Sequence, residues 1–287
     1  MSLINLTTAL KYARQGNFAV GAFNITNEEM FYGVLDAAIA EKSPIIIAFA
    51  AGHMQYIRLE SMMDLVRREI SKAPVPVVIH LDHCTSFELI MKAIQLGFTS
   101  VMYDGSSLSL EENIQNTRRV VDLAHVLNIS VEGELGHVGG DAGESGVPAP
   151  KDARFTDPAQ VPDYIRRTGV DALAVSFGTA HGLYKEEPKL DYDLLVKLDA
   201  ASRVPLVMHG GSGLPDRDFT TAIYYGIRKI NFFTGLARDA TESIRSRLED
   251  ESFVFYPELD QHVHDAIFKT VSHYLKLWGS SGKAWLQ

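Results

Sequence analysis

The chain has little of what secreted, membrane-spanning or disulfide-stabilised proteins need. Cys84 is the only cysteine, which excludes a disulfide within the chain and fits a reducing compartment. No apolar run approaches the roughly 20 residues that span a bilayer. Residues 1–10 also lack the basic start and the apolar stretch of a secretory signal. We therefore expect a cytoplasmic protein with no membrane partner.

The chain also lacks an excess of positive charge. The formal net charge is −9, and no basic tract is present to neutralise a phosphate backbone, so no nucleic-acid partner is expected. The 287 residues are 46% hydrophobic, which provides ample material for a large core. Because no linker, repeat or low-complexity segment divides the chain, we predict a single domain over residues 1–287.

Short apolar runs alternate with helical patterns along the chain. Near-continuous Val, Ile and Phe in these runs indicate strands buried on both faces, as in a parallel sheet covered by helices. Eight strands in about 250 residues predict a (β/α)8 TIM barrel, of α/β class. An open doubly wound sheet is the alternative, but its first strand usually leads into a glycine-rich turn, which is missing here. The predicted strands are Phe18–Phe23, Pro44–Phe49, Val75–His80, Ser100–Tyr103, Ser130–Glu134, Ala172–Ser176, Pro205–His209 and Lys229–Phe232.

Helical patterns and one long loop lie between these strands. Ser109 and Glu112 form a capping-box pattern, and Thr156-Asp157-Pro158 predicts a further helix start. Gly139–Phe155 is the one long irregular stretch, and such loops on the active face of a barrel often act as lids. We therefore predict a mobile active-site loop near residues 139–155. The predicted helices are Glu28–Glu41, Ser86–Leu96, Glu111–Leu127, Asp191–Ser202, Asp216–Tyr225, Ala237–Leu248 and Leu259–Trp278.

Histidines lie at three predicted strand ends, on the face where a barrel places its active site. His181 alone would more often be a structural histidine. Together with His83 and His209 it supplies three nitrogens and leaves a coordination position open, the pattern of a catalytic zinc. Asp82 beside His83 suits a proton acceptor near a metal-activated group. Adjacent residues of an extended strand point apart, so both reach one site only if the chain turns there.

Acidic and glycine-rich segments end other strands on this face. Glu132 and Glu134 share one face of the fifth strand, and Asp104 ends the fourth. Acidic groups at one rim repel one another unless a cation or protons intervene, so they indicate an outer metal position or hydrogen bonding to backbone and water. His209–Gly213 offers backbone N–H groups near a helix start, which suits a phosphate, although a plain glycine turn is the alternative. Asn231–Thr234 ends the eighth strand, another frequent phosphate position.

These motifs, taken together, resemble a known family. In order and spacing the chain is similar to the class II, metal-dependent ketose-bisphosphate aldolases, in the branch of the tagatose- and fructose-bisphosphate aldolases. The resemblance implies reversible, Zn²⁺-dependent cleavage of a ketose 1-phosphate or 1,6-bisphosphate into dihydroxyacetone phosphate and an aldehyde. It is carried by Ala22-Phe23-Asn24, His80–His83, Met102–Ser106, Glu132–Gly140, Ala180-His181-Gly182, His209–Gly213, Asn231–Thr234 and Gly279–Ala284.

The resemblance also implies roles for single residues. It makes His83, His181 and His209 the zinc ligands and Asp82 the catalytic acid and base. Asp104 and Glu134 match a second or displaced metal position. It further implies a monovalent cation, Na⁺ or K⁺, near the phosphate, and a homodimer or homotetramer. The residues that match the site for the dihydroxyacetone phosphate half are Gly182, Gly210, Gly211, Ser212, Asn231, Phe232, Phe233 and Thr234.

The chain departs from the family pattern in three places. Gly139-Gly140 is not followed by consecutive glutamates, which leaves Asp141 and Glu144 as candidates for the acid that protonates C3. Phe232 and Phe233 fill the phosphate motif, and Phe49–His53 lacks a serine that helps bind the far phosphate. These departures point to a different aldehyde half, such as that of a phosphorylated sugar acid, which His53 or Arg58 would meet. Two further hypotheses are a different barrel metal hydrolase and a noncatalytic sugar-phosphate binder.

Overall fold

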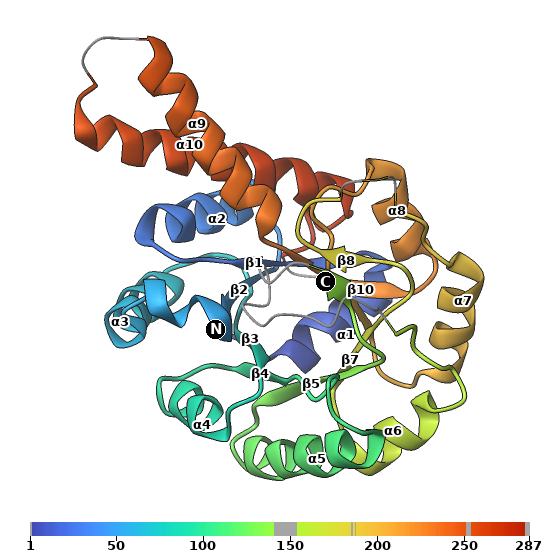
Figure 1. The fold of residues 1–287 in the computed structure, drawn as a ribbon. Helices are drawn as coiled ribbons and strands as arrows, with labels where there is room; N and C mark the ends of the chain where they lie inside the picture. The colour runs from blue at the N-terminus through green and yellow to red at the C-terminus, as the bar shows by residue number, and fades with distance from the viewer. Residues whose placement is uncertain (1, 141–153, 185, 187, 251–253, 285–287) are drawn as a thin grey trace.

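The computed structural model describes residues 2–140, 154–184, 186, 188–250 and 254–284. Eight parallel strands close a barrel in the order β1-β10-β9-β7-β5-β4-β3-β2, which confirms the predicted (β/α)8 fold (Figure 1). Two further short strands, β6 (Gly139–Gly140) and β8 (Ala180–His181), pair with each other outside the barrel. The barrel strands are β1 Val20–Asn24, β2 Ile45–Ala50, β3 Val77–Cys84, β4 Ser100–Tyr103, β5 Ser130–Leu135, β7 Ala172–Val175, β9 Leu206–Met208 and β10 Ile227–Phe232.

Helices surround the barrel and alternate with its strands. Each helix predicted from the sequence is present, with ends that shift by a few residues. Across the residues that the structure describes, none of the helices is long and apolar enough to cross a membrane. The helices are α1 Leu6–Gly16, α2 Glu28–Ala40, the 3₁₀ helix η1 Ala51–Tyr56, α3 Leu59–Ile70, α4 Phe87–Gln95, α5 Leu110–Val126, α6 Val161–Thr168, α7 Tyr192–Ala201, α8 Asp216–Tyr224, α9 Thr234–Asp250 and α10 Tyr256–Leu277.

The two predicted helix starts have opposite outcomes. Ser109 Oγ accepts a hydrogen bond from Glu112 N, and the Glu112 carboxylate accepts one from Ser109 N, so the capping box is confirmed. The start predicted at Thr156 is wrong, because α6 begins at Val161. The Thr156 hydroxyl instead joins two barrel strands: it donates to Leu135 O and accepts from Ser176 N at 2.8 Å. It satisfies backbone groups where β5 and β7 end.

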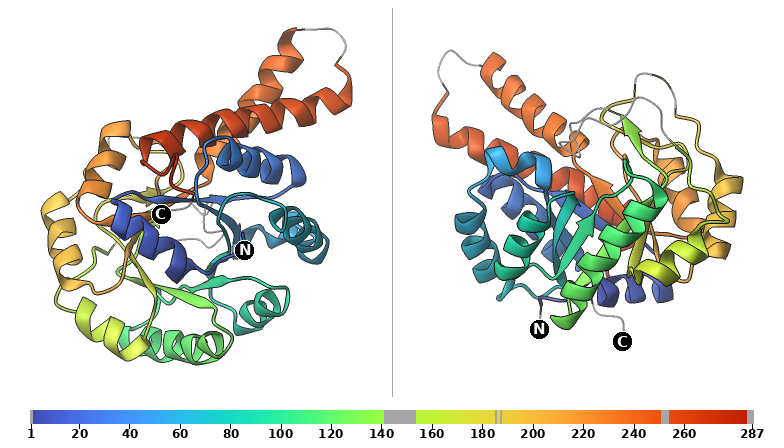
Figure 2. Two further views of the ribbon diagram at one scale, coloured as in Figure 1. Left: turned by 180° about the vertical axis from the view of Figure 1, so that it is seen from behind. Right: turned by 60° about the horizontal axis from the view of Figure 1, so that its bottom comes forward.

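α1, which we did not predict, closes the amino-terminal end of the barrel (Figure 2, left). Leu6 and Leu10 of this helix are fully buried and pack with Phe18 against apolar side chains in the barrel interior. The interior partners include Val20, Ala22, Ile46, Val78, Met102, Ala172, Ala174 and Val207. Because this end is filled with apolar side chains, the polar groups of the interior gather toward the carboxyl ends of the strands.

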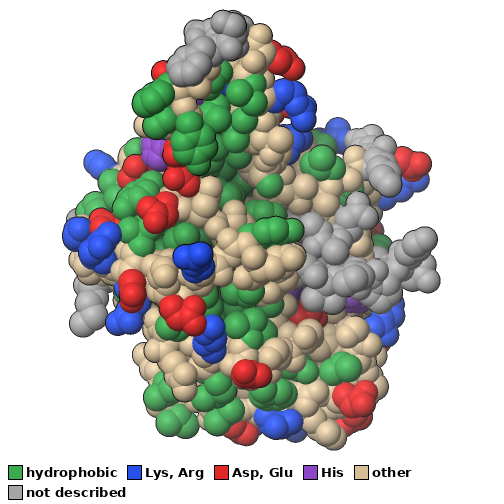
Figure 3. All heavy atoms as spheres, turned by 60° about the vertical axis from the view of Figure 1, so that its left-hand side comes forward, with side chains coloured by type: hydrophobic (Ala, Val, Ile, Leu, Met, Phe, Trp, Pro, Cys, Tyr) green, Lys and Arg blue, Asp and Glu red, His purple; other side chains and the backbone are tan. Residues whose placement is uncertain are grey.

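α9 and α10 form a hairpin that projects from the barrel (Figures 1 and 2). α10 runs back along α9 and also packs on α2. Just beyond α10, the indole of Trp278 stacks on Phe23 of β1, with ring centroids 5.6 Å apart. The projecting part carries hydrophobic side chains on its surface (Figure 3), and those of Leu248, Phe255 and Tyr256 are more than half exposed. The hairpin is therefore anchored at its base and apolar toward its end.

His264 of α10 makes the α2–α10 contact sensitive to pH. Its Nε2 lies 3.1 Å from Asp36 Oδ2, and its Nδ1 lies 2.9 Å from Asp265 Oδ1. Burial lowers the pKa of His264, but the hydrogen bonds to Asp265 and Asp36 outweigh it and raise the pKa above the ordinary value. The stabilisation that a raised His264 pKa provides is fully present at pH values below the pKa of the unfolded chain, about 6.5. It is lost as the pH rises through the pKa of the folded protein.

Asp36→Asn should therefore destabilise the protein more at low pH than at high pH. We expect a loss of less than about 1 kcal/mol near pH 6, because the pair is partly exposed, and a smaller loss near pH 9. Chemical unfolding at the two pH values measures both. Asp122→Asn is the control, because the partner of Asp122 is Arg118, which keeps its charge throughout. An equal loss for Asp36→Asn at both pH values would contradict the assigned linkage.

Candidate metal centre and active site

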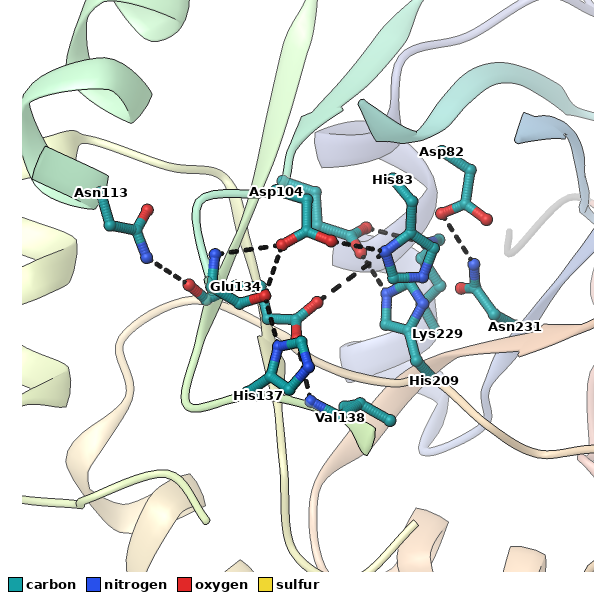
Figure 4. A network of polar contacts seen from close by, with 12 residues as sticks. Asp82, His83, Asp104, Asn113, Glu134, His137, Val138, His209, Lys229 and Asn231 are labelled. Atoms are coloured by element: carbon teal, nitrogen blue, oxygen red, sulfur yellow. Dashed lines mark hydrogen bonds and ion pairs between the residues drawn. The ribbon is translucent and has the colours of Figure 1, made fainter. Parts of the chain in front are cut away.

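The end of β3 bends so that Asp82 and His83 both face the barrel mouth (Figure 4). His83 has a φ of 46°, in the left-handed region that residues with a Cβ atom rarely occupy. The pairing of β3 with β4 shifts register between Leu81 and Cys84 at the same place. This irregularity is the turn that the sequence required, and it brings two adjacent side chains to one site.

Three histidines from three separate segments of the chain meet there. One nitrogen each of His83, His181 and His209 lies within 4.8 Å of the others, and all three side chains are buried. The ring centroids of His83 and His209 are 4.4 Å apart, and those of His83 and His181 are 4.8 Å apart. Within the described residues, His83 Nε2 and His209 Nδ1 are buried with no hydrogen-bond partner. Buried imidazole nitrogens that converge in this way fit a zinc ion with an open coordination position.

Carboxylates hold the opposite nitrogens of two of these rings. His83 Nδ1 lies 3.0 Å from Asp104 Oδ2, and His209 Nε2 lies 2.9 Å from Glu132 Oε1. A ring nitrogen that donates to a carboxylate carries the proton, which leaves a lone pair on the other nitrogen for a metal. His83 also forms a second group within 4.8 Å with Asp104 and Glu134. The two residues predicted for a second metal position therefore lie beside the histidines.

The site carries excess negative charge. Burial alone would lower the pKa of His83, but the charges of Asp82 and Asp104 outweigh it and raise that pKa to about 10. Burial and the neighbouring Asp104 raise the pKa of Glu134 to about 8. Both shifts favour the form with more positive charge, so the surroundings of His83 favour a cation.

Two amides hold the carboxylate of Asp82. Asn24 Nδ2 donates to one oxygen at 3.0 Å. Asn231 Nδ2 donates to the other at 3.0 Å (Figure 4). Burial would raise the pKa of Asp82, but positive charge at His83 outweighs it and lowers the pKa below the ordinary value. Asp82 is therefore an oriented, ionised carboxylate next to the histidines. We did not assign a role to Asn24 from the sequence, although its place after an apolar strand was the available signal.

A buried ion pair, which we did not predict from the sequence, lies deeper in the barrel. Lys229 Nζ lies 2.8 Å from Glu132 Oε2, and both side chains are fully buried. Burial would raise the pKa of Glu132, but the charge of Lys229 and the hydrogen bond from His209 lower it to about 2. Next to this pair, His80 Nδ1 lies 2.8 Å from Ser100 Oγ. The only sequence signal was a lysine inside an apolar strand, two residues before Asn231.

Part of the predicted phosphate site lies against the start of α9. Gly182 and Gly210 have φ values of 91° and 71°, which favour glycine, and a Cβ on Gly210 would lie 2.5 Å from Ala180 O. Ser212 Oγ accepts a hydrogen bond from Gly235 N at 3.0 Å, which ties the loop after β9 to the first turn of α9. A glycine loop against the amino terminus of a helix favours an anion.

The four residues at the end of β10 point in different directions. Asn231 faces the interior and binds Asp82, whereas Phe232 packs outward with its ring centroid 4.3 Å from that of Tyr274. The Phe232 side chain therefore cannot contact a ligand in the barrel mouth, and only the backbone of this residue can. The ring of Phe233 lies 4.3 Å from that of His53, a buried residue of η1. Thr234 begins α9. Arg58, at the start of α3, is exposed.

Both ends of the predicted lid loop are fixed. Gly139–Gly140 pairs with Ala180–His181, and a Cβ on Gly140 would collide with the backbone of His181. At the other end, His137 N donates to Arg154 O at 2.7 Å and Arg154 N donates to His137 O at 3.1 Å. Residues 141–153, with the candidate acids Asp141 and Glu144, lie outside the described residues. The loop's mobility therefore stays a prediction.

Fold and site together define a barrel enzyme with a candidate metal centre at the carboxyl ends of its strands. The family model "Fructose-bisphosphate aldolase class-II" matches residues 4–283, so the chain belongs to the class II fructose-bisphosphate aldolase family, whose activity is that of a lyase. It is 41% identical over 285 residues to a sulfofructosephosphate aldolase of Alkalicoccus urumqiensis, with 99% of each chain covered. It is 39% identical over 292 residues to a fructose-bisphosphate aldolase of Geobacillus stearothermophilus, again with 99% of each covered. The crystal structure of the YdjI aldolase from Escherichia coli K12 has a TM-score of 0.88 and 37% identity, covering 99% of this chain and all of that one.

Proposed function

We propose that this protein is a Zn²⁺-dependent aldolase that reversibly cleaves a ketose 1-phosphate or 1,6-bisphosphate into dihydroxyacetone phosphate and an aldehyde. The observation that carries the proposal is the convergence of His83, His181 and His209 within 4.8 Å, beside the oriented carboxylate of Asp82. These three histidines would hold the zinc, and Asp104 and Glu134 with His83 would offer a second position. When bound, zinc would act as a Lewis acid toward negative charge that develops on substrate oxygens.

Asp82 is the proposed base and acid of the reaction. In the cleavage direction it accepts the proton of the C4 hydroxyl while the C3–C4 bond breaks, and in the reverse direction it returns that proton. The amides of Asn24 and Asn231 hold its two oxygens, so little reorganisation is needed as the proton moves. A separate acid protonates C3, and we propose Asp141 or Glu144 for this step.

The phosphate of the substrate would bind where the glycine loop meets α9. Backbone N–H groups at a helix amino terminus can donate to an anion, and the partial positive charge of that terminus adds to the attraction. We assign Na⁺ or K⁺ to the same region because the family resemblance implies it. The residues proposed for this half of the substrate are Gly182, Gly210, Gly211, Ser212, Asn231, Phe232, Phe233 and Thr234.

A sugar bearing a second acidic group other than phosphate is the second candidate substrate. Its specific support is the segment from the end of β2 into η1, where Phe49–His53 lacks the serine expected for a far phosphate and His53 lies against Phe233. A relative named sulfofructosephosphate aldolase is as similar as one named fructose-bisphosphate aldolase. Family membership, with relatives named as aldolases, disfavours both the barrel hydrolase and the noncatalytic binder.

A substrate panel tests the proposed function. We would measure dihydroxyacetone phosphate release by the zinc-loaded protein from fructose 1,6-bisphosphate, tagatose 1,6-bisphosphate, sulfofructose 1-phosphate and simple ketose 1-phosphates. One substrate should exceed the others in kcat/KM by about tenfold or more, because a site built for one polar group rejects analogues that lack it. Zinc-loaded protein that released no dihydroxyacetone phosphate from any of them would contradict the proposal.

We further propose a homodimer or homotetramer in the cytoplasm. The hairpin of α9 and α10 supports the assembly, because Leu248, Phe255 and Tyr256 leave apolar surface exposed on it (Figure 3). Burial of these side chains against another copy would remove that surface from water. The cytoplasmic location rests on the single cysteine and stays a prediction.

A further inference from the structure

The Lys229–Glu132 ion pair crosses the interior of the barrel beneath the histidine cluster. Lysine and glutamate are almost never fully buried unless they are paired. Here Lys229 Nζ occupies one carboxylate oxygen of Glu132 at 2.8 Å, and the other oxygen lies 2.9 Å from His209 Nε2. The three side chains thus form a chain of contacts that ends on a proposed zinc ligand.

Strand order explains why the chain of contacts ends on His209. Lys229 lies on β10 and Glu132 on β5, and β9 and β7 separate these strands in the barrel. Lys229 is in register with Val207 of β9, and His209 follows Val207 by two residues, on the same side of the strand. The pair therefore spans the barrel below His209 and supports its ring from the interior.

We propose that Lys229 and Glu132 are positioning residues that hold His209 with Nε2 as donor and Nδ1 directed at the metal. The inference rests on the metal site of the proposed function. Lys229 binds one oxygen of Glu132 and so fixes the carboxylate, whose other oxygen then fixes the ring and its tautomer. His80 Nε2 also faces Glu132 Oε2, but at 3.8 Å it lies farther from that oxygen than Lys229 Nζ does at 2.8 Å, so Lys229 is the closer partner.

The test compares zinc binding by Lys229→Met, Glu132→Gln and the double variant. The zinc dissociation constant is measured by competition with a chromogenic chelator, and the visible spectrum of the Co²⁺-substituted protein reports ligand geometry. Each single change should weaken zinc binding by about 10–100-fold and alter the Co²⁺ spectrum. Because the pair acts as one unit, the zinc affinity of the double variant should fall about as far as that of the single variant that binds zinc more weakly. It should not fall by the product of the two single losses.

Thr168→Val is the matched control. Thr168 is fully buried and donates to Tyr164 O at 2.7 Å, but it lies on α6 outside the network. The control should lose stability and keep the parent zinc affinity. Variants of the pair that lose stability while keeping zinc affinity and the Co²⁺ spectrum would overturn the inference, as would failure of all three to fold, since the pair would then serve core stability. A parent protein that binds no zinc would instead contradict the proposed function.

Discussion

Asp82→Asn is expected to lower kcat for ketose phosphate cleavage by about 10²–10⁴-fold, the range that general acid–base catalysis contributes. Asparagine has nearly the same size, but its amide cannot take up the C4 hydroxyl proton. The three histidines are unchanged, so the variant should still bind one zinc per chain. Zinc content and single-turnover cleavage of the best substrate measure the two effects separately.

The control for this variant is Asp122→Asn, the same change at an exposed salt bridge far from the barrel mouth. It should retain the parent rate. If Asp82→Asn cleaved its substrate within about tenfold of the parent rate while holding zinc, Asp82 would not be the group that moves the proton.

His209→Ala is expected to remove both zinc and activity. The change takes away one of three nitrogen ligands, and His209 is fully buried, so no solvent-exposed side chain can take its place. Loss of a residue that only hydrogen-bonds to a metal ligand typically weakens metal binding by up to about 100-fold. Loss of the ligand His209 itself should weaken zinc binding by more than that. Metal content after dialysis against a weak chelator and the rate of dihydroxyacetone phosphate release check the two losses.

The matched control is His264→Ala, which removes a histidine of α10 that binds Asp36 and Asp265. It should keep one zinc per chain and the parent rate. Retention of a full zinc equivalent by His209→Ala would remove His209 from the ligand set, and with it the proposed role of Glu132 and Lys229.

Local patterns predicted the barrel and the convergence of the histidines. Eight apolar runs with helices between them have few arrangements, and a parallel barrel gathers the residues after each strand at one end. The turn at His83 followed from a simple contradiction: Asp82 and His83 are adjacent, and a straight strand cannot aim both at one site. The structure has that turn.

Contacts across the barrel could not be predicted from single strands. Whether Lys229 contacts Glu132 depends on closure of the barrel and on the register of each intervening strand. Neither can be predicted from the sequences of β5 and β10 alone. Phe232 is different, since alternation along β10 could have shown that it faces the helices once Asn231 was placed inside. Two α-helices were not predicted: α1, which precedes the strands and closes the barrel end, and α3, which lies between β2 and β3.

The most direct test of a metal-dependent aldolase at this site is dihydroxyacetone phosphate release before chelation, after chelation and after zinc is restored. We predict that removal of the metal abolishes release from the best ketose phosphate and that about one equivalent of Zn²⁺ per chain restores it. Release at the full rate from protein shown to hold no metal would contradict the account, since three converging histidines would then have no part in the reaction.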